Sequence, residues 1–374
     1  MLFRALVFAF MLCIIASPIN AQSKSEDQAN LFPIVVNGKW GYIDKTGKEI
    51  IKPQYENALD YAYGLAVVET DGGVGIINVN GNTVVEPEYD LALCLTENRI
   101  AVLKNSTWAI VDTNGRIVVE SRYRYIGDYS EGLLAVYEGT RKTGKWGFID
   151  MSGETIIEPQ FEEVFGFSEG LAPVKVAGKW GYINKTGIFV IKPIFDFAVP
   201  FKWGFGITTL SGEFGLVDRK GKFQVIQQYD SVGEFSEGLA SVYKGEHPNA
   251  KWGYVDTQYQ IVVELKYDYA HEFSEGLAAV SLDGKYGFID KIGNFIIEPQ
   301  FYSAGDFSEG MASIILSDKY GFIDRRGNMM IKPQYDNVDS FSSGIVQVFI
   351  EDETPYLKIG YVDKAGEYIW EPTR

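Results

Sequence analysis

The residues GFSEG at positions 166–170 have a composition and spacing that could support nucleophilic chemistry. The pattern GxSxG is that of a nucleophile elbow, a tight turn that holds a catalytic serine between a strand and a helix. A hydrolase of this kind would use Ser168 and would need a helix directly after it. Whether Ser168 can act in this way depends on the elements that position it.

The same stretch recurs elsewhere in the chain. It reads DYSEG at 128–132, EFSEG at 234–238 and 272–276, and DFSEG at 306–310, so the first glycine of the elbow pattern is incidental. No helical pattern follows Ser168, and Gly170 begins another strand-like segment. The recurrence favours a turn in a repeat over a hydrolase, which remains a remote alternative. The sequence predicts no catalytic residue and no cofactor.

A single repeat unit occurs ten times along the chain. The position of Trp40 in KWGYID (39–44) is matched at nine later positions, and the steps between matches are 34, 34, 38, 34, 34, 38, 34, 34 and 39 residues. The matched residues are Val74, Trp108, Trp146, Trp180, Phe214, Trp252, Tyr286, Tyr320 and Ile359. Internal repeats of this period indicate a solenoid, a propeller or a stacked array.

Each unit contains three segments with the pattern of short strands. They are typified by WGYID, by EIIKPQY after an Asp-x-x-Gly turn, and by GLAPVKV, and no long stretch has helical spacing. Proline recurs at one position of the second segment, which predicts a strand end, a bulge or a sheet edge. The fold class is therefore all-β, with about ten tandem three-stranded antiparallel β repeats over residues 31–374.

The arrangement of the repeats is less constrained than their content. The longer third step favours units stacked as a solenoid or superhelix with about three units per turn. A closed β-propeller is the alternative. The chain starts with a third segment and stops after a second segment, a phase that fits a propeller and an open array equally. A superhelix of this kind, or duplication of a three-unit block, would put the three longer loops on one side.

The N-terminal residues have the shape of an export signal. Arg4 precedes an apolar run from Ala5 to Ala16, and a stretch of small and polar residues ends at Ala21. We expect residues 1–21 to be a signal peptide that is removed, and residues 22–30 to be a short linker. No later apolar run has membrane-spanning length, so the mature chain is expected in the periplasm or outside the cell, without a membrane span.

Charge and cysteine content exclude several functions. The formal net charge is −16, and no basic cluster offsets it, which disfavours nucleic acid as a partner. Cys94 is the one cysteine outside the predicted leader, so no internal disulfide is expected. Two scattered histidines provide neither a zinc site nor an acid–base pair.

The recurring KWGYID, turn glycine, IIKPQY and FSEGLA stretches resemble the WG-containing (KWG) repeat family. The resemblance covers the chain from Leu31 onward, although the namesake tryptophan is kept in only five units. It implies a bacterial β-repeat protein, and it brings no family-wide catalytic residue or cofactor.

Two kinds of residue are candidates for ligand contact in the repeat turns. Trp203 stands where other units have a glutamate, so we expect either an exposed contact aromatic or a local cap on the core. If units stack, the glutamates could form an acidic row for Ca²⁺ or a basic partner, but a hard cation needs about six to eight converging oxygens, so no metal site is predicted. These glutamates are Glu131, Glu169, Glu237, Glu275 and Glu309.

Three expanded loops supply the remaining candidates. They are EGTRKTGK at 138–145, KGEHPNAK at 244–251 and IEDETPYLK at 350–358, and they differ while their framework repeats. Variable loops on a fixed scaffold often carry binding, or they drift without consequence. Their candidate contact residues are Arg141, Lys142, His247 and Tyr356.

Together these features predict an exported, non-enzymatic binding or scaffold protein. Its partner would be an envelope protein, contacted through one face or through the three long loops. A cell-wall or other glycan is the alternative ligand, which would require exposed aromatics flanked by carboxylates and amides.

Overall fold

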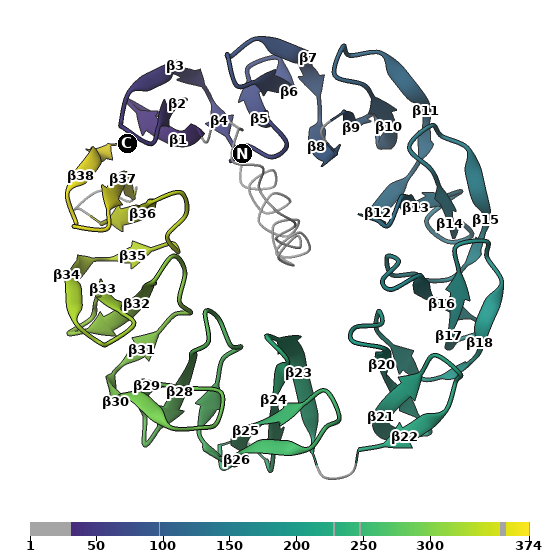
Figure 1. The fold of residues 1–374 in the computed structure, drawn as a ribbon. Coiled ribbons are helices and arrows are strands. Elements are labelled where there is room, and N and C mark those ends of the chain that lie inside the picture. Colours follow the sequence, from purple (N-terminus) through teal and green to yellow (C-terminus); the bar gives the residue numbers. More distant parts are fainter. Residues whose placement is uncertain (1–30, 97, 227–228, 247, 352–356, 374) are drawn as a thin grey trace.

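The computed structural model describes residues 31–96, 98–226, 229–246, 248–351 and 357–373. In this part of the chain every regular element is a strand, and the strands form ten small antiparallel sheets. Figure 1 shows the sheets as blades arranged in a ring around a central opening. The all-β prediction is therefore confirmed, the solenoid arrangement was wrong, and the alternative closed β-propeller describes the fold. The predicted leader (1–21) and linker (22–30) lie outside the described residues.

Blades 1 to 5 follow one another along the first half of the chain (Figure 1). Blade 1 contains β1 (Leu31–Val36), β2 (Lys39–Asp44) and β3 (Glu49–Tyr55), and blade 2 contains β4 (Asn57–Ala58), β5 (Leu65–Thr70), β6 (Gly73–Asn78) and β7 (Thr83–Tyr89). Blade 3 contains β8 (Leu91–Thr96), β9 (Arg99–Lys104), β10 (Thr107–Val111) and β11 (Ile117–Tyr123). Blade 4 contains β12 (Tyr125–Ser130), β13 (Leu133–Glu138), β14 (Lys145–Ile149) and β15 (Thr155–Phe161), and blade 5 contains β16 (Leu171–Val176), β17 (Lys179–Asn184) and β18 (Phe189–Phe195).

Blades 6 to 10 continue the ring in the same order. Blade 6 contains β19 (Phe197–Ala198), β20 (Phe205–Leu210), β21 (Glu213–Asp218) and β22 (Phe223–Val225), and blade 7 contains β23 (Ser231–Ser236), β24 (Leu239–Lys244), β25 (Lys251–Asp256) and β26 (Ile261–Tyr267). Blade 8 contains β27 (Tyr269–Ala270), β28 (Ala278–Leu282), β29 (Lys285–Ile289) and β30 (Phe295–Phe301). Blade 9 contains β31 (Ser303–Ala304), β32 (Met311–Leu316), β33 (Lys319–Asp324) and β34 (Met329–Tyr335), and blade 10 contains β35 (Asn337–Val338), β36 (Ile345–Ile350), β37 (Lys358–Asp363) and β38 (Tyr368–Thr373).

Most blades have one more strand than the sequence predicts. Eight of the ten sheets have four strands, and the additional strand lies innermost, next to the central opening (Figure 1). In five blades this strand is only two residues long, so no alternation of apolar and polar residues could reveal it. The three predicted segments form the second, third and outermost strands.

The innermost and outermost strands bury side chains of different size. The innermost strands bury alanines such as Ala198 and Ala270, whereas the outermost strands end in large buried rings such as Phe195 and Tyr267. Because cores pack at nearly constant density, each blade is thin near the axis and thick at the rim. Face-to-face stacking of such wedges fits the curved arrangement of the blades.

Aromatic pairs hold neighbouring blades together. The ring two residues after the WG tryptophan packs against the FSEG-type aromatic of the next blade, as in Tyr254 and Phe273 with centroids 4.8 Å apart. The fully buried Tyr254 also donates a hydrogen bond to the His271 carbonyl at 2.6 Å. The corresponding pairs are Tyr42–Tyr61, Phe148–Phe167, Tyr182–Phe201, Phe288–Phe307 and Phe322–Phe341. The repeated aromatics at these two positions are therefore core residues.

The Gly and Pro positions that recur among the units reflect an irregularity in the pairing of the outermost strand. Between β2 and β3 the pairing shifts after Trp40–Tyr55, and Pro53 lies at this shift on the edge strand. A Cβ on Gly41 would lie 2.4 Å from the Ile51 carbonyl oxygen, so a larger residue here would force the strands apart. Proline at a bulge on an edge strand is as the sequence predicts.

Side-chain packing closes the ring without exchanging a strand. Tyr361 of blade 10 donates a hydrogen bond to the Pro33 carbonyl of blade 1 at 2.8 Å, and its ring lies 5.7 Å from that of Phe32. Ile34 and Ile43 share a buried cluster with Ile345 and Tyr361. Each terminal blade is thus built from one end of the chain only, as Figure 1 shows.

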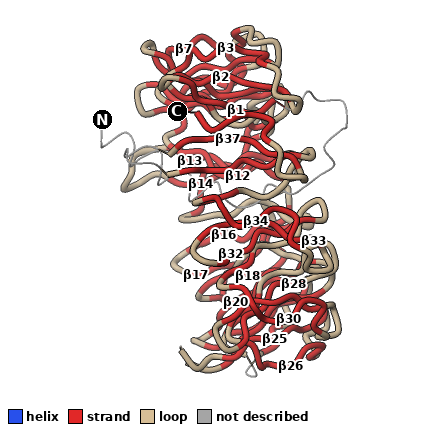
Figure 2. Tube along the Cα trace, turned by 90° about the vertical axis from the view of Figure 1, so that its left-hand side faces the viewer, coloured by secondary structure: helices blue, strands red, loops and turns tan. Residues whose placement is uncertain are grey.

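The alternation of strand direction gives the ring two distinct faces, which Figure 2 views from the edge. We call the face with the FSEG-type and Asp-x-x-Gly turns the turn face. The opposite face, with the hairpins between the second and third strands, is the hairpin face. The three long loops connect the second and third strands of blades 4, 7 and 10, so their described ends lie on the hairpin face, and their length accounts for the longer steps in the repeat.

Candidate functional site

Serine hydroxyls tie neighbouring blades on the turn face. Ser236 of blade 7 donates to the Phe273 carbonyl of blade 8 at 2.6 Å. Ser168, the serine of the GxSxG pattern, donates in the same way to the Phe201 carbonyl at 2.6 Å. Strand β16 follows directly after Gly170, so Ser168 lies in a hairpin turn and not before a helix. The remaining serine ties are Ser274–Phe307 and Ser308–Phe341.

Glutamates form a second tie on the turn face. The Glu237 carboxylate of blade 7 accepts the Gly276 N–H of blade 8 at 3.0 and 3.2 Å, and the Lys291 ammonium lies 3.1 Å from the same carboxylate. Lys291 also donates to the Glu237 carbonyl at 3.0 Å. Five glutamates make this tie to the next blade's turn: Glu131, Glu169, Glu237, Glu275 and Glu309.

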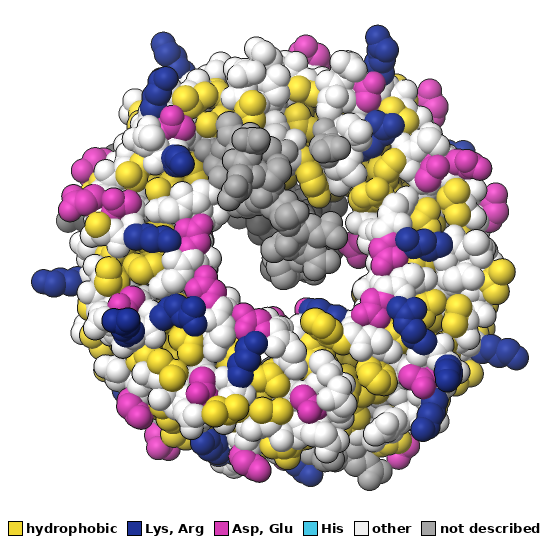
Figure 3. Space-filling view, in the orientation of Figure 1, with side chains coloured by type: hydrophobic (Ala, Val, Ile, Leu, Met, Phe, Trp, Pro, Cys, Tyr) yellow, Lys and Arg dark blue, Asp and Glu magenta, His cyan; other side chains and the backbone are white. Residues whose placement is uncertain are grey.

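The glutamates of the possible acidic row have partners within the chain. Lysine or arginine contacts four of the five carboxylates, and Figure 3 shows acidic side chains around the central opening with basic side chains beside them. Within the described ranges, no group of three or more His, Cys, Asp or Glu residues could hold a metal ion. The oxygens of these glutamates are thus used to join blades.

Lysine–carboxylate pairs tie the blades on the hairpin face. Lys251, the lysine before the WG pair of blade 7, lies 2.6 Å from Asp268 of blade 8, and this hydrogen bond holds the pKa of the Asp268 carboxyl below its ordinary value. The other carboxylate oxygen of Asp268 accepts the Gly284 N–H at 3.3 Å. The two paired residues are always 17 positions apart. The equivalent pairs are Lys39–Glu56, Lys179–Asp196 and Lys319–Asp336.

The seam between blades 6 and 7 lacks all three ties. Lys202 replaces the serine, Trp203 replaces the glutamate, and Glu213 replaces the lysine before the WG pair. One exposed ion pair spans the turn face instead, between the Lys202 ammonium and Glu234 at 2.7 Å. The repeat therefore changes at this seam on both faces of the ring.

Trp203 is an exposed aromatic held in an unusual backbone conformation. Its φ is 58°, and 52% of its surface is exposed. A left-handed backbone is strongly disfavoured for a bulky residue, and the glutamates at this position offset that strain with hydrogen bonds that an indole cannot make. Tyr63 of blade 2 shares the position, with φ 56° and 41% exposure. The sequence prediction missed Tyr63, although alignment of Gly64 with Gly204 would have found it.

The core of this seam is also rearranged. Leu216 takes the place of the aromatic seen at the regular seams, and Tyr259 takes the place of the turn glycine, with φ 59°. The buried Tyr259 ring packs against Phe235 at 5.4 Å and Phe205 at 6.1 Å. Strand β22 has only three residues, where most outermost strands have seven. The blades thus remain packed, with a different set of side chains.

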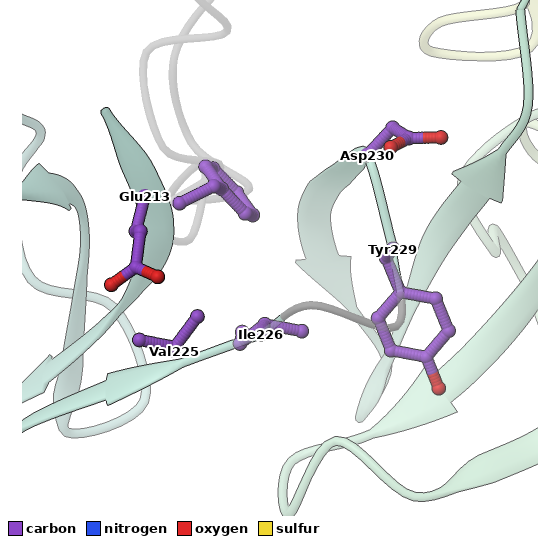
Figure 4. Close-up of a pocket in the computed structure, with 6 residues that line it drawn as sticks. Glu213, Val225, Ile226, Tyr229 and Asp230 are labelled. Atoms are coloured by element: carbon purple, nitrogen blue, oxygen red, sulfur yellow. The ribbon is translucent and has the colours of Figure 1, made fainter.

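A pocket of about 220 Å³ opens at this seam. Figure 4 shows Glu213 and Val225 on one side, Tyr229 and Asp230 on the other, and Ile226 between them. Glu213 and Asp230 are 17 positions apart, the spacing of the lysine–carboxylate pairs. This fixed spacing is a sequence signal that could have identified the pair, but only once its meaning in the fold is known. The sixth lining residue is Phe214.

The predicted loop residues lie away from Trp203. Arg141 and Lys142 are exposed in the long hairpin of blade 4, on the hairpin face, whereas Trp203 lies on the turn face. His247 and Tyr356 lie outside the described residues. The structure therefore does not bring the loops and Trp203 into one site.

Cys94 is the one cysteine among the described residues, and it is not a reactive group. Cys94 lies in β8 against the core shared by blades 2 and 3, and burial raises the pKa of its thiol to about 12, so it is protonated at neutral pH. Across the described ranges, no helix has the length and apolarity needed to cross a membrane.

The fold and its inter-blade ties define a β-propeller of ten blades. The chain belongs to the family described as WG containing repeat, whose model matches nine segments that together span most of the sequence. The matched segments are residues 40–73, 75–108, 108–139, 146–180, 180–208, 214–246, 252–286, 286–320 and 320–352. No significant match was found among curated protein sequences.

Solved structures are similar in fold only. A structure titled as the eukaryotic initiation factor aligns with a TM-score of 0.54 and 13% identity, over 92% of this chain and 96% of that one. The tricorn protease aligns with a TM-score of 0.27 and 11% identity, over 91% of this chain and 44% of that one. A quinonprotein alcohol dehydrogenase-like protein from Bacteroides thetaiotaomicron gives 0.33 and 10%, over 83% of each chain.

Proposed function

We propose that this protein is an exported, non-enzymatic binding protein that contacts a partner protein through the turn face around Trp203. The observation that carries the proposal is the exposed, left-handed Trp203 in a position where five other blades have a glutamate tie. A bulky residue in a strained conformation, without the tie that offsets the strain elsewhere, points to a role outside the fold.

The surroundings of Trp203 suit a protein partner. Lys202, in the same turn as Trp203, pairs with Glu234, and Glu169, in the equivalent turn of blade 5, pairs with Arg219. Both signs of charge therefore flank the exposed indole. Tryptophan and arginine are the residue types most enriched at energetic centres of protein interfaces. Export is supported by the leader-like residues 1–21, which the structure does not describe.

The test uses a variant that restores the regular turn. Trp203→Glu removes the indole and supplies the carboxylate that the Gly238 N–H would meet at this seam, so the fold is expected to be preserved. Wild-type and variant proteins serve as baits in an envelope extract, and binding of the captured partner is then measured with both purified proteins. We expect the variant to bind at least tenfold more weakly.

The control variant is Ile117→Glu. Ile117 is 57% exposed on the outer strand of blade 3, so this change introduces the same residue at another exposed apolar position. Ile117→Glu is expected to bind like the wild type. Equal partner binding by the Trp203→Glu variant and the wild type would refute the proposal.

A glycan ligand is the second candidate, favoured by one observation. Tyr63 and Trp203 share one turn position, and both rings are exposed on the turn face. If the ligand is a cell-wall glycan, the protein will co-sediment with purified wall material, and Trp203→Ala and Tyr63→Ala will each weaken this. Absence of co-sedimentation would dismiss this candidate.

A further inference from the structure

The pocket between blades 6 and 7 stands in the place of a lysine–carboxylate tie. At four other seams a lysine ammonium from one blade meets a carboxylate of the next, 17 residues later. Asp230 occupies the carboxylate position here, and its Oδ2 accepts the Gly245 N–H at 2.7 Å, as Asp268 accepts that of Gly284. The position of the lysine is held by Glu213, so the charge expected there is reversed.

Neither carboxylate is neutralised from within the described chain. Among the residues that the structure describes, no lysine or arginine forms an ion pair with Glu213 or Asp230. The two acidic residues line the opening together with Phe214, Val225, Ile226 and Tyr229, so that polar and apolar side chains both border it (Figure 4). The pocket therefore presents two acidic side chains together with apolar side chains that methylene groups could contact.

We infer that this pocket binds a primary alkylammonium group, either a lysine side chain of another protein or a small free alkylamine. The ammonium would take the place that the tie lysine holds at the other seams, and its methylene groups would lie on the apolar walls, as lysine stems commonly do. The site is on the hairpin face, so it is separate from the Trp203 surface and does not depend on the proposed function.

The aromatic walls support an ammonium over other cations. At the seam between blades 8 and 9 the acid of the tie is replaced by Tyr302, and the Lys285 ammonium lies 3.3 Å from the centre of that ring. Lysine at this position thus meets either a carboxylate or an aromatic face, and the pocket is lined by acidic and by aromatic residues. A divalent ion would require about six to eight oxygens, which two carboxylates on opposite sides of the pocket do not supply.

The size of the pocket favours a ligand with one unbranched alkyl chain. Its volume of about 220 Å³ is below the range of roughly 300–1,000 Å³ that accommodates drug-sized ligands. An unbranched alkyl chain ending in an ammonium group is consistent with this volume, whereas a bulky amine is not.

The experiment titrates the full chain with n-pentylammonium and, separately, with n-pentanol, and follows binding by ligand-detected NMR. We expect saturable binding of the amine and at least tenfold weaker binding of the alcohol. Glu213→Lys rebuilds the tie used at the other seams and fills the site, so it should weaken amine binding at least tenfold. Glu213→Gln removes the charge without filling the pocket and should weaken it severalfold.

The matched control is Glu120→Lys, which makes the same charge change on the outer strand of blade 3 and should bind the amine like the wild type. Equal binding of amine and alcohol, or undiminished amine binding by Glu213→Lys, overturns the inference, as does a wild type that binds neither. Trp203→Glu should leave amine binding unchanged, which separates this result from a failure of the proposed function.

A further pair of probes distinguishes the two sources of the ammonium group. Acetyl-glycyl-lysyl-glycinamide presents a lysine side chain without a free N-terminus, and it is compared with n-pentylammonium. Peptide binding at least as tight as that of the amine assigns the site to a partner protein. Binding of the amine alone assigns it to small free alkylamines.

Discussion

At the seam between blades 7 and 8, a buried aromatic pair, a serine, a glutamate and a lysine all join the two blades. At the seam between blades 6 and 7, Leu216, Lys202, Trp203 and Glu213 occupy the corresponding positions. Both seams are packed, and both belong to the same closed ring (Figure 1). The comparison therefore separates what closes the ring from what merely reinforces it.

The difference indicates that two blades can join without the regular polar ties. At the irregular seam a cluster with Tyr259 and Phe235 replaces the regular aromatic pair, and no polar tie of the regular kind is kept. The ion pairs at the other seams lie at partly exposed positions, where each pair by itself contributes little to stability. Blade turns can therefore change without loss of the fold, and the exposed indole and the acidic pocket both lie where they have changed.

The largest expected effect comes from removing the buried ring at the regular seam. Tyr254→Ala should lower the free energy of unfolding by about 3–5 kcal/mol, because the ring is fully buried against Phe273. Urea denaturation measures the change. Tyr254→Phe keeps the ring and loses only the hydrogen bond to the His271 carbonyl, about 1 kcal/mol. Equal losses in the two variants would show that the ring itself does not hold the blades together.

The glutamate tie can be broken at one seam and introduced at the other. Glu237→Ala should lower the free energy of unfolding by about 1–2 kcal/mol, because the Gly276 N–H loses a charged acceptor. Trp203→Glu should raise it by about 1 kcal/mol, because a carboxylate would offset the strain of the left-handed turn. Thermal and urea unfolding of both variants test this. If Trp203→Glu destabilises the protein, the indole has a structural role that the exposed position does not reveal.

A smaller effect is expected from exchanging charges on the hairpin face. Lys251→Glu places two carboxylates at the regular seam and should destabilise the protein by about 0.5–1 kcal/mol, whereas Glu213→Lys should stabilise it by about 0.5 kcal/mol. Both effects should shrink in high salt, because the groups are partly exposed. Urea midpoints at low and high salt measure them. Shifts of the same sign in the two variants would contradict the equivalence of the two positions.

Much of the fold follows from the sequence, because strand and turn signals are local. WGYID and EIIKPQY form the two outer strands of a blade, and the proline position predicts the edge strand at which Pro53 lies. The closed ring could not be predicted in the same way. Closure depends on side-chain packing between blades that are far apart in the sequence, such as Tyr361 on Phe32, and the two-residue inner strands carry no periodic signal.

The candidate site was only partly predictable, for a related reason. Trp203 is conspicuous because alignment of the repeats shows what it replaces. Glu213 also departs from its repeat position, but its meaning depends on Asp230 in the next blade. Only the structure shows that residues 17 positions apart face each other across a seam. The role of the glutamates was hidden similarly, since their partners are backbone groups of the following blade.

The smallest expected effect is in the acid sensitivity of the lysine–carboxylate ties. The lysine hydrogen bonds hold the pKa values of Asp268 and Asp336 below the ordinary value, so in acid the unfolded chain binds more protons than the folded one. Their contribution is complete above about pH 5 and is lost as pH falls through the lowered pKa values. Overall charge neutralisation acts on every variant alike, so the informative quantity is a difference. The urea midpoint should fall less between pH 6 and pH 3 in Lys251→Met than in the wild type. Glu213→Lys adds a tie and should show a larger fall. Identical pH dependence in all three proteins would mean that these ties do not contribute to the stability of the ring.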